Sequence, residues 1–509
     1  MSTWTFPSLP EGARYLVLGL GETGGAAARW GVRHGGGLRV ADTRSEPPGR
    51  DTLLQAAGHA DVDWRLGDAA LQADVLDGID AVVLSPGLCP FDEPVAGLLV
   101  EAATREIPVL GEMELFARAL ADMREQGYAP QVLAITGTNG KTTVTSMTRQ
   151  LVQAAGLKAV AAGNISPAAL QALAKAIDTN DLPDVWVLEL SSFQLHTLKS
   201  LQADAAVVLN ITQDHLDWHG SLQAYAASKA ALYGMARQRV VNRDDPLVVD
   251  MVPRLDAMNV RSFGRGVPQL EGDMGLESDH GITWLASSEP LDFERLPART
   301  PRGRKQVELL RTPGRLVQLM PVDAMRVRGE HNAMNALAAL ALLRTLGLGW
   351  AEPLNALRDY VGQPHRTQFV RSIQGIDFVN DSKGTNVGAS VAAIEGMGAP
   401  VVLIAGGLGK GQDFTPLAQA VAGHARAVVL IGQDAPLIAQ ALEGVAVPVQ
   451  LAATLDDAVE QAWKAAKPGD TVLLSPACAS MDMFRNYGHR GQAFAEAVDE
   501  LARQQGEVA

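Results

Sequence analysis

One glycine-rich segment of the chain has the residue types to bind the phosphates of a nucleotide. The apolar run VLAIT leads into GTNGKTT, residues 137–143, and the helix-like stretch TSMTRQLVQAAG comes next. Glycines let backbone N–H groups turn inward and a helix N-terminus adds a positive dipole, while Lys141 offers a point charge and Thr142 a hydroxyl for Mg²⁺. The match to G-x-x-x-x-G-K-[ST] is imperfect, because Ile135 stands at the first glycine. The flanking strand and helix nevertheless favour a phosphate loop over a structural turn.

A second glycine-rich turn, GLGETG, follows an apolar run near the amino terminus. Gly19, Gly21 and Gly24 form a G-x-G-x-x-G pattern, and Asp42 ends the next predicted strand. This spacing is typical of a dinucleotide-binding fold, in which the glycines approach a diphosphate and the acid binds a ribose. The pattern alone favours NAD. The same turn would hold any nucleotide with a diphosphate, and a purely structural turn also stays open.

A carboxylate and a histidine stand just beyond two predicted strands downstream of the phosphate loop. Glu189 lies in VLELSSFQ, and His215 lies in NITQDHLDWHG. Since ligands of parallel sheets collect at the carboxyl ends of the strands, both side chains could converge on the phosphate loop and bind a hard cation. Magnesium prefers oxygen ligands, so Glu189 is the better candidate, whereas an isolated histidine such as His215 more often has a structural role.

Polar loops follow several predicted strands in the last third of the chain. They are PHR (364–366), NDSKGTN (380–386), GGLGKGQDF (406–414) and SPACASMDMF (475–484). Lysine gives compact positive charge and hydroxyl groups fix orientation, so these loops together predict one cleft for a small dicarboxylate or a phosphate. Each loop alone is an ordinary solvated segment, and the inference depends on their recurrence after strands.

The elements that must position these loops alternate between strands and helices. Apolar runs that predict buried parallel strands are RYLVLGLG, AVVLSPG, QVLAITG, VWVLELSS, AAVVLNIT, PVVLIAGG, AVVLIG and TVLLSP. Amphipathic, helix-like stretches separate them, which is the pattern of an α/β protein whose parallel sheets are covered on both faces. The alternation gives three blocks, which begin near Tyr15, before Gly137 and at the turn 362–364. It lapses between about residues 264 and 323, where the sequence contains the basic patch PARTPRGRK, and we expect a solvated loop or a β-extension there.

Length and composition exclude several classes of protein. The 509 residues are enough for roughly three domains. The 43 Lys and Arg against 57 Asp and Glu give a net charge of −14, which argues against a general nucleic-acid binder. Cys89 and Cys478 are too few for a disulfide-based fold, and the first residues lack the regions of a secretory signal. With no run of about 18 apolar residues, we expect a cytoplasmic protein without a membrane span.

Seven motifs, in their order along the chain, resemble those of the Mur ligases. They are GTNGKTT, ELSSFQL, DHLDWHG, HNAMNALAA, PHR, NDSKGTN and SPACAS, and the resemblance covers nearly the whole chain apart from residues 264–323. GLGETG, DTR and SPG in the first block are similar to the uridine-nucleotide domain of these enzymes. NDSKGTN, in a chain without a DNPR motif, resembles the branch that adds D-glutamate.

The resemblance implies an α/β chain of three domains. They would be a Rossmann-like UDP-substrate domain (1–111), a central P-loop ATPase-like parallel-sheet domain (112–361, including the extended region 264–323) and a Rossmann-like amino-acid-binding domain (362–509). The implied activity is an ATP-dependent amide ligation in the cytoplasmic part of peptidoglycan precursor synthesis. ATP would phosphorylate the carboxylate of UDP-MurNAc-L-alanine, and the D-glutamate amine would displace phosphate from the acyl phosphate. The partners would be small molecules only, without nucleic acid or membrane, and we expect a monomer.

The resemblance also implies roles for individual residues. Catalysis would rest on Lys141, His215 and Lys229, and Lys229 is similar in place to the lysine that the family carbamylates, which makes it carboxylate-like. The ATP-binding residues would be Gly137, Thr138, Asn139, Gly140, Lys141, Thr142, Thr143, Asn335, Arg366 and Asp381. Two Mg²⁺ ions would be held by Thr142, Glu189, His215 and Lys229. The substrate residues would be Gly21, Glu22, Thr23, Asp42, Thr43, Arg44, Ser85, Pro86 and Gly87 for the uridine diphosphate, Asn164 for the acceptor, and Lys383, Thr385, Lys410, Ser480 and Tyr487 for D-glutamate.

Three other functions remain open at this point. Another amide ligase, such as a folylpolyglutamate synthetase, would share the phosphate loop but should lack GLGETG and DTR. An NAD-dependent dehydrogenase would explain Gly19 to Gly24 and would leave Lys141 and Glu189 without a role. A non-catalytic ATP-binding switch would hydrolyse ATP without needing an amino acid.

Overall fold

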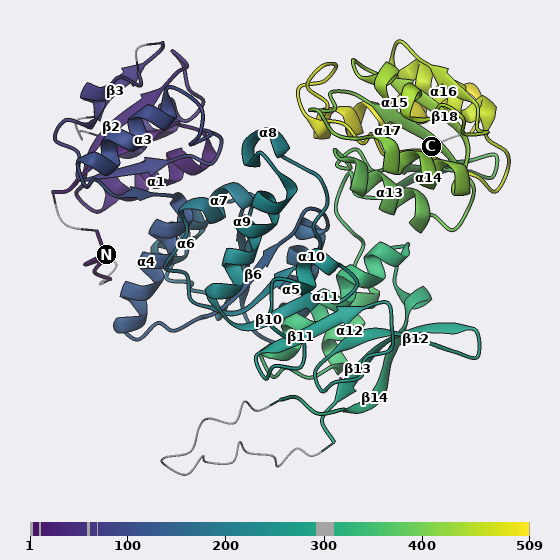
Figure 1. Ribbon diagram of the computed structural model, residues 1–509, viewed down its shortest axis with the longest axis horizontal. Coiled ribbons are helices and arrows are strands. Elements are labelled where there is room, and N and C mark those ends of the chain that lie inside the picture. The colour runs from purple at the N-terminus through teal and green to yellow at the C-terminus, as the bar shows by residue number, and fades with distance from the viewer. Residues whose placement is uncertain (1–3, 10–11, 59–61, 69, 292–309, 508–509) are drawn as a thin grey trace.

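The computed structural model describes residues 4–9, 12–58, 62–68, 70–291 and 310–507, which form three α/β units, each around its own sheet. Figure 1 shows the amino-terminal unit in purple at the upper left, the central unit in blue to green below, and the carboxy-terminal unit in green and yellow at the upper right. The α/β class predicted from the alternating apolar runs is confirmed.

The amino-terminal unit is built on a parallel sheet with the strand order β3-β2-β1-β4-β5. Its strands are β1 (Arg14–Leu18), β2 (Gly37–Asp42), β3 (Val62–Leu66), β4 (Ala81–Leu84) and β5 (Val109–Leu110), and its helices are α1 (Glu22–Arg33), α2 (Arg50–Ala57) and α3 (Val95–Thr104), with a 3₁₀ turn, η1 (Ala73–Leu76). The strand order reverses between β1 and β4, and the GLGETG turn follows β1. Open α/β sheets bind their ligands at such a switch point.

The central unit has the sheet order β14-β13-β12-β11-β10-β9-β6-β8-β7. The parallel strands are β6 (Gln131–Thr136), β7 (Ala159–Gly163), β8 (Val185–Glu189), β9 (Ala203–Val208), β10 (Ala236–Asn242), β11 (Val260–Gly264) and β12 (Met274–Asp279). Antiparallel pairing then adds β13 (Ile282–Glu289) and β14 (Arg315–Pro321), so the described part of the stretch 264–323 extends the sheet at one edge. The basic patch PARTPRGRK lies outside the described residues.

Helices cover both faces of the central sheet because the side chains of β6 alternate between them. Leu133 and Ile135 pack with α5 (Lys141–Ala154) and α11 (Glu330–Thr345), whereas Val132 and Ala134 pack with the helices of the opposite face. The other helical segments of the unit are α4 (Glu112–Glu125), α6 (Ala169–Asp178), α7 (Ser192–Thr197), α8 (Leu216–His219), α9 (Leu222–Gly234), α10 (Pro246–Val249), α12 (Ala351–Arg358) and the 3₁₀ turn η2 (Val322–Ala324).

The carboxy-terminal unit has the sheet order β15-β16-β20-β17-β18-β19, which is parallel apart from the β15–β16 pair. Its strands are β15 (Gln368–Ile373), β16 (Ile376–Asn380), β17 (Val401–Gly406), β18 (Ala425–Ile431), β19 (Val449–Leu451) and β20 (Thr471–Leu474). Its helices are α13 (Val387–Gly396), α14 (Thr415–His424), α15 (Ala435–Ala441), α16 (Leu455–Ala465) and α17 (Tyr487–Gln504).

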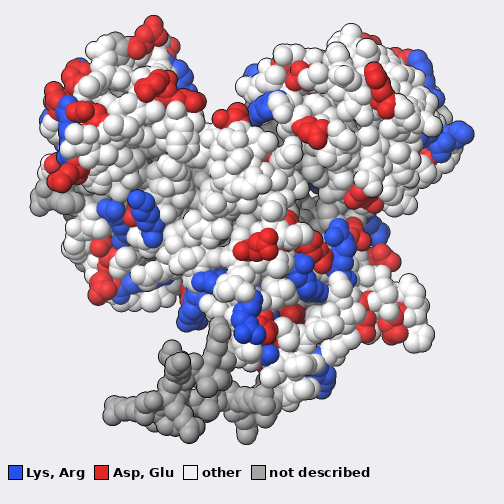
Figure 2. All heavy atoms as spheres, in the orientation of Figure 1, with Lys and Arg blue, Asp and Glu red and all other residues white. Residues whose placement is uncertain are grey.

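The three units are joined in different ways. One hydrophobic cluster runs from Trp30 of α1 to Leu120 of α4 and Leu173 of α6, so the amino-terminal and central units share a core. The carboxy-terminal unit has two clusters of its own, one on each face of its sheet. In Figure 2 the amino- and carboxy-terminal lobes stand apart above the central lobe, with acidic and basic side chains interspersed on the visible face. None of the described helices combines the length and the apolar character that crossing a bilayer requires.

Candidate active site

The phosphate loop connects β6 to α5 at the carboxyl end of the central sheet. Gly140 is the N-cap of α5 and has a φ of +82°, which favours glycine. A Cβ atom there would lie 2.5 Å from the Oδ1 atom of Asn335, so the helix α11 also requires a glycine at this position. The glycine thus lets the loop turn directly into α5, whose first N–H groups can bind an anion.

The ammonium group of Lys141 folds back over the loop. It donates to the carbonyl oxygens of Gly137 at 2.9 Å and Thr138 at 2.8 Å. Burial lowers the pKa of Lys141, while the carboxylates of Glu189 and Asp214 act to raise it. The lysine thus stands inside the loop, between two carboxylates, where its charge can act on a phosphate.

Glu189 ends β8 and has one oxygen atom free for a cation. Its Oε1 atom accepts a hydrogen bond from Nδ2 of Asn164 at 2.8 Å. Its Oε2 atom is buried and accepts no hydrogen bond from the described residues. An unpartnered buried carboxylate oxygen is unfavourable unless a ligand satisfies it, and a hard cation would do so.

His215 lies beside the same region but is not bonded to Glu189. It adopts a φ of +53° before α8, and its Nε2 atom lies 3.6 Å from Oδ2 of Asp214. The ring packs edge-on against Phe193, with 4.7 Å between the ring centroids. Burial lowers the pKa of His215, so the ring is neutral at pH 7 and keeps a lone pair. No three His, Cys, Asp or Glu side chains of the described residues gather into a metal cluster.

Lys229, on α9, is only 1% exposed. Its Nζ atom lies 3.4 Å from the hydroxyl oxygen of Thr136, at the end of β6, and 4.6 Å from the ring centroid of Tyr225. Burial drives the pKa of Lys229 well below its ordinary value, and the nearby Lys141 adds to this effect. Burial therefore favours the neutral amine, which is the nucleophilic form, over the ammonium.

A cavity of about 580 Å³ opens between the phosphate loop, α11 and the carboxy-terminal unit. Among the expected ATP-binding residues, those that line it are Asn139, Gly140, Thr143, Asn335, Arg366 and Asp381. Asp381 accepts from Ser475 Oγ at 2.8 Å and from the amide of Thr367 at 3.1 Å, and burial raises its pKa to about 6. The volume lies in the range of small-molecule sites.

A second cavity, of about 300 Å³, lies at the switch point of the amino-terminal sheet. Its lining includes most of the residues expected to hold the uridine diphosphate, namely Gly21, Thr23, Asp42, Thr43, Arg44, Ser85 and Gly87. Of the other two, Pro86 lines a neighbouring small cavity with Thr23, and Glu22 is exposed on α1. Gly24 must be glycine, because a Cβ atom would lie 1.9 Å from the carbonyl oxygen of Gly19.

Asp42 and Arg44 form the charged part of this second cavity. The Arg44 guanidinium donates to both oxygens of Asp42, at 2.8 and 2.7 Å, and the amide of Leu20 also donates to Asp42 at 2.8 Å. Burial acts to raise the pKa of Asp42, but these hydrogen bonds bring it below its ordinary value. Arg44 keeps 52% of its side chain exposed and can turn to a ligand.

The residues expected at the D-glutamate end are spread over three loops and the start of α17. The Nζ atom of Lys383 lies 4.0 Å from the ring centroid of Tyr487. Thr385 follows on the same loop as Lys383. Lys410 and Ser480 lie on the loops after β17 and β20, which a short bridge between Leu408 and Ala479 brings side by side. Burial, followed by the charges of Arg366 and Lys141, lowers the pKa of Lys383 to about 8.

Two residues of this region received no role from the sequence. Asp214 lies between Lys141, Lys229 and His215 and influences the pKa of all three. Asn386 reaches from the carboxy-terminal unit to the phosphate loop. Both stand inside quoted motifs, DHLDWHG and NDSKGTN, so their positions were visible although their contacts were not.

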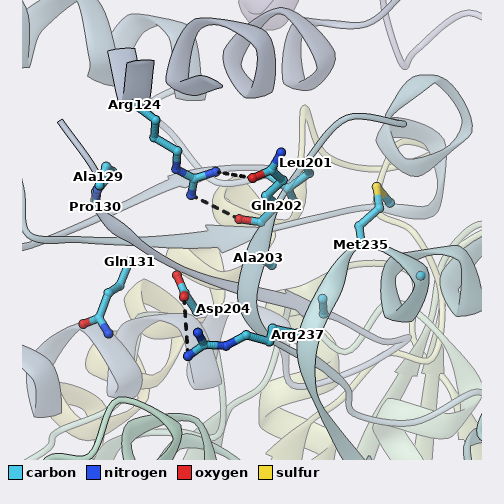
Figure 3. A pocket seen from close by; sticks show the side chains of 12 residues that line it. Arg124, Ala129, Pro130, Gln131, Leu201, Gln202, Ala203, Asp204, Met235 and Arg237 are labelled. Atoms are coloured by element: carbon cyan, nitrogen blue, oxygen red, sulfur yellow. Dashed lines mark hydrogen bonds and ion pairs between the residues drawn. The ribbon is translucent and has the colours of Figure 1, made fainter. Parts of the chain in front are cut away.

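A further pocket, of about 530 Å³, lies at the amino ends of the central strands, where β6, β9 and β10 begin. Figure 3 shows its two arginines: Arg124 bonds to Gln202, and Arg237 faces Asp204 at 4.0 Å. None of the predicted site residues lines this pocket. The predicted site residues thus lie away from this pocket.

Comparison with known proteins gives matches along nearly the whole chain. Family models match residues 13–111 (Mur ligase MurD-like, N-terminal domain), 135–343 (Mur ligase middle domain) and 365–478 (Mur ligase, glutamate ligase domain). The UDP-N-acetylmuramoylalanine–D-glutamate ligase of Bordetella avium is 60% identical over 97% of both chains. The enzyme of the same name from Burkholderia pseudomallei is 53% identical over 96% of this chain and 97% of its own.

Solved structures show the same fold at low sequence identity. The MurF ligase of Thermotoga maritima, in complex with ADP, is 17% identical and has a TM-score of 0.56, covering 92% of this chain and 96% of its own. The UDP-N-acetylmuramate-alanine ligase MurC of the same organism is 17% identical with a TM-score of 0.54, covering 96% of this chain and 99% of its own.

Proposed function

The chain belongs to the Mur ligase family, and from this premise we propose that it joins D-glutamate to UDP-N-acetylmuramoyl-L-alanine while ATP is cleaved to ADP and phosphate. One observation carries the choice of amino acid: relatives that are 60% identical over 97% of both chains are D-glutamate ligases. The arrangement of the cavities supports it, because one lies at the nucleotide-binding turn of the amino-terminal unit and the other at the phosphate loop.

The reaction must activate a carboxylate, because an amine does not displace oxide from it at neutral pH. In the proposed path an oxygen of the acceptor carboxylate attacks the γ-phosphorus of ATP, the bond to the bridging oxygen breaks and ADP leaves. The D-glutamate amine then attacks the carbonyl carbon of the acyl phosphate, loses a proton, and expels phosphate from the tetrahedral intermediate. One amide bond and one phosphate result from each ATP.

Lys141 and Arg366 supply the cationic side chains of the phosphoryl transfer. Lys141 would leave its two loop carbonyls to meet the transferring phosphate, and Arg366 would approach from the carboxy-terminal unit. Such a transition state depends on positioned positive charge rather than on covalent help from the protein. Holding the carboxylate and the γ-phosphate in line contributes on the order of 7 to 11 kcal/mol.

The residues present fit Mg²⁺. Glu189 offers a buried oxygen that no described residue satisfies, and Thr142 offers a hydroxyl in the first turn of α5. We assign one ion to these two residues and a second to His215 and a modified Lys229. When bound, Mg²⁺ supplies charge that offsets the negative oxygens of the phosphoryl group.

Modification of Lys229 would solve the problem of an amine among metal ligands. A neutral amine adds CO₂ with loss of one proton, and the resulting carbamate is an anion with two oxygen ligands. The nearly complete burial of Lys229 favours the neutral, reactive amine over the ammonium. The carbamate would face the end of β6, where Thr136 already lies 3.4 Å from Nζ.

The three units would divide the ligands among them. Residues 1–111 would bind the uridine nucleotide, 112–361 would bind ATP, and 362–509 would bind D-glutamate. Since one chain supplies all three regions, a monomer is sufficient. The use of ATP and of a nucleotide sugar supports a reaction in the cytoplasm.

The experiment that tests this function measures phosphate release from ATP and Mg²⁺ with UDP-MurNAc-L-alanine, adding D-glutamate, L-glutamate or neither. We expect release that depends on D-glutamate and a product heavier by one glutamyl residue. Release that is indifferent to both substrates would leave an ATP-binding switch, and NADH formed or consumed during turnover would indicate the dehydrogenase instead.

A further inference from the structure

Asn386 makes hydrogen bonds that join the carboxy-terminal unit to the phosphate loop. Its Nδ2 atom donates to Oδ1 of Asn139 at 3.0 Å and lies 3.3 Å from Oδ2 of Asp214. In return, Nδ2 of Asn139 donates to Oδ1 of Asn386 at 3.3 Å. The two asparagines, 247 residues apart in the sequence, thus form a reciprocal amide pair beside a carboxylate, which we call the asparagine clasp.

Asn386 also caps a helix, but capping alone does not explain an asparagine. Its Oδ1 atom accepts from the amide of Ala389 at 2.9 Å, which makes it the N-cap of α13. Serine, aspartate and asparagine are about equally good at this position, because each supplies the oxygen acceptor. Only asparagine adds a side-chain N–H₂ group, and that group is the part that reaches Asn139 and Asp214. The residue type therefore fits the clasp.

The residue of the phosphate loop that takes part in the clasp, Asn139, is itself held in place by backbone hydrogen bonds. The amide of Asn139 donates to Oδ1 of Asn210 at 2.8 Å, and its carbonyl oxygen accepts from Nδ2 of Asn210 at 3.2 Å. Asn139 is thereby fastened to the loop after β9. Asn386, which is 4% exposed, stands three residues after Lys383 on the same loop. A contact between the two asparagines consequently relates the position of Lys383 to that of the phosphate loop.

The asparagine clasp belongs to an interface between the carboxy-terminal and central units that contains several polar contacts. The carboxy-terminal unit has its own two hydrophobic clusters, and polar contacts join it to the central unit. They include Gln363 with Ser146 at 2.7 Å and the ring of His331 with Thr367 at 3.3 Å. Because such contacts exchange with hydrogen bonds to water, each contributes only about 0.5–1.5 kcal/mol to holding the units together. Within this interface the clasp is a point where the carboxy-terminal unit meets the phosphate loop.

We propose that Asn386 is a positioning residue that sets the carboxy-terminal unit in register with the phosphate loop through Asn139 and Asp214. The proposal rests on the proposed function, because the register matters for bringing the D-glutamate amine to the acyl phosphate. Asn386 itself does not line the cavity at the phosphate loop. Its loss should therefore affect the use of D-glutamate and the closure of the unit more than the binding of ATP.

The test uses Asn386→Ser in the full chain, because serine keeps the helix cap and offers one short hydroxyl in place of the amide. Losing two to three hydrogen bonds predicts that kcat/KM for D-glutamate falls about tenfold. The Kd of a non-hydrolysable ATP analogue should change less than about twofold, since the central unit keeps its phosphate loop. Asn386→Asp also keeps the cap and places a second carboxylate beside Asp214, so it should lose more activity than Asn386→Ser.

The control is Thr454→Ala, which removes an N-cap in the same unit far from the phosphate loop. Thr454 accepts from the amide of Asp457 at 3.1 Å at the start of α16. This variant should lower the melting temperature and keep kcat/KM. Asn386→Ser should keep the melting temperature and lower kcat/KM. Small-angle X-ray scattering of the ligand-free proteins adds a readout that needs no reaction. Asn386→Ser should have a larger radius of gyration than the wild-type protein, because its carboxy-terminal unit is held less firmly to the central unit.

The proposal is overturned if Asn386→Ser keeps the wild-type kcat/KM and scattering curve, or if it merely loses stability as Thr454→Ala does. An Asn386→Asp variant more active than Asn386→Ser would exclude Asp214 from the clasp. A failure of the proposed function looks different: the wild-type chain would then release no D-glutamate-dependent phosphate. The scattering comparison would in that case still decide whether the clasp holds the unit.

Discussion

The guanidinium group of Arg366 donates a hydrogen bond to the hydroxyl of Thr142 at 2.5 Å, although 224 residues separate them in the sequence. Thr142 stands in the first turn of α5, and Arg366 stands in the segment that leads into β15. The hydroxyl proposed for Mg²⁺ is thus met by a cation from the other unit. Binding of ATP should replace this contact with one from Arg366 to a phosphate oxygen.

Arg366→Lys should slow the reaction strongly. Lysine keeps the charge, but it lacks the planar fork that can contact two phosphate oxygens. Removing one donor of this kind predicts a loss of about 100-fold in kcat. Phosphate release measures the loss. Arg371→Lys is the matched control, because Arg371 pairs with Asp499 at 3.0 Å on the outside of the same unit and should stay near the wild-type rate. Equal rates for the two variants would contradict the role of Arg366.

The activity of the chain should depend on CO₂ through Lys229. Incubation in CO₂-free buffer at mildly acidic pH should remove the carbamate and the activity, and bicarbonate should restore both. Lys229→Ala should be inactive and insensitive to bicarbonate, and added formate or acetate should recover part of its activity by replacing the missing carboxylate. An active chain in strictly CO₂-free buffer would show that Lys229 works as an unmodified amine.

The use of D-glutamate should weaken in mild alkali. The pKa of Lys383 is lowered to about 8, so its ammonium is present below that pH and is lost as the pH rises above it. Since only the charged form attracts a carboxylate, kcat/KM for D-glutamate should fall about tenfold per pH unit above 8 relative to Lys383→Arg. Dividing the wild-type kcat/KM by that of Lys383→Arg cancels the effect of the D-glutamate amine, because its titration affects both proteins equally. If this ratio stayed constant from pH 7 to 10, a residue other than Lys383 would bind the carboxylate of D-glutamate.

Arg44→Ala should raise KM for the uridine nucleotide without affecting that for ATP. Arg44 is the cationic side chain lining the cavity at the switch point, and the loss of one charge-assisted contact predicts an increase of about tenfold. Initial rates at varied substrate concentrations measure both constants. Arg65→Ala, which breaks pairs with Asp63 and Asp74 in the same unit, should change neither. A higher KM for the uridine nucleotide in both variants would indicate that they are generally less stable, and would contradict a specific role for Arg44.

The sequence was sufficient for the parallel strands because their apolar runs are nearly continuous. VLAIT and VVLIAG appear as β6 and β17, and the residues of β17 are all buried. The antiparallel additions were harder to predict. RLVQLMP and QFVRSI form β14 and β15 at the edges of their sheets, where one residue of each strand is buried and the apolar signal is weak.

The roles given to site residues stay predictions, and the structure shows which of them lie together. Motif residues at strand ends, such as Glu189 and Lys141, could be placed at one edge because parallel strands end together. Contacts between units could not be predicted in this way. The pairing of Asn139 with Asn386 depends on how two separately folded sheets dock, which no local pattern records.

The most direct test of the account follows oxygen from the acceptor. UDP-MurNAc-L-alanine with both carboxylate oxygens labelled as ¹⁸O is turned over with ATP, Mg²⁺ and D-glutamate, and the released phosphate is analysed by mass spectrometry. The account predicts one ¹⁸O atom in each phosphate and one in the new amide, because the carboxylate attacks phosphorus and leaves as acyl phosphate. Phosphate without ¹⁸O would mean that water takes the phosphoryl group, and the chain would then not be activating this carboxylate.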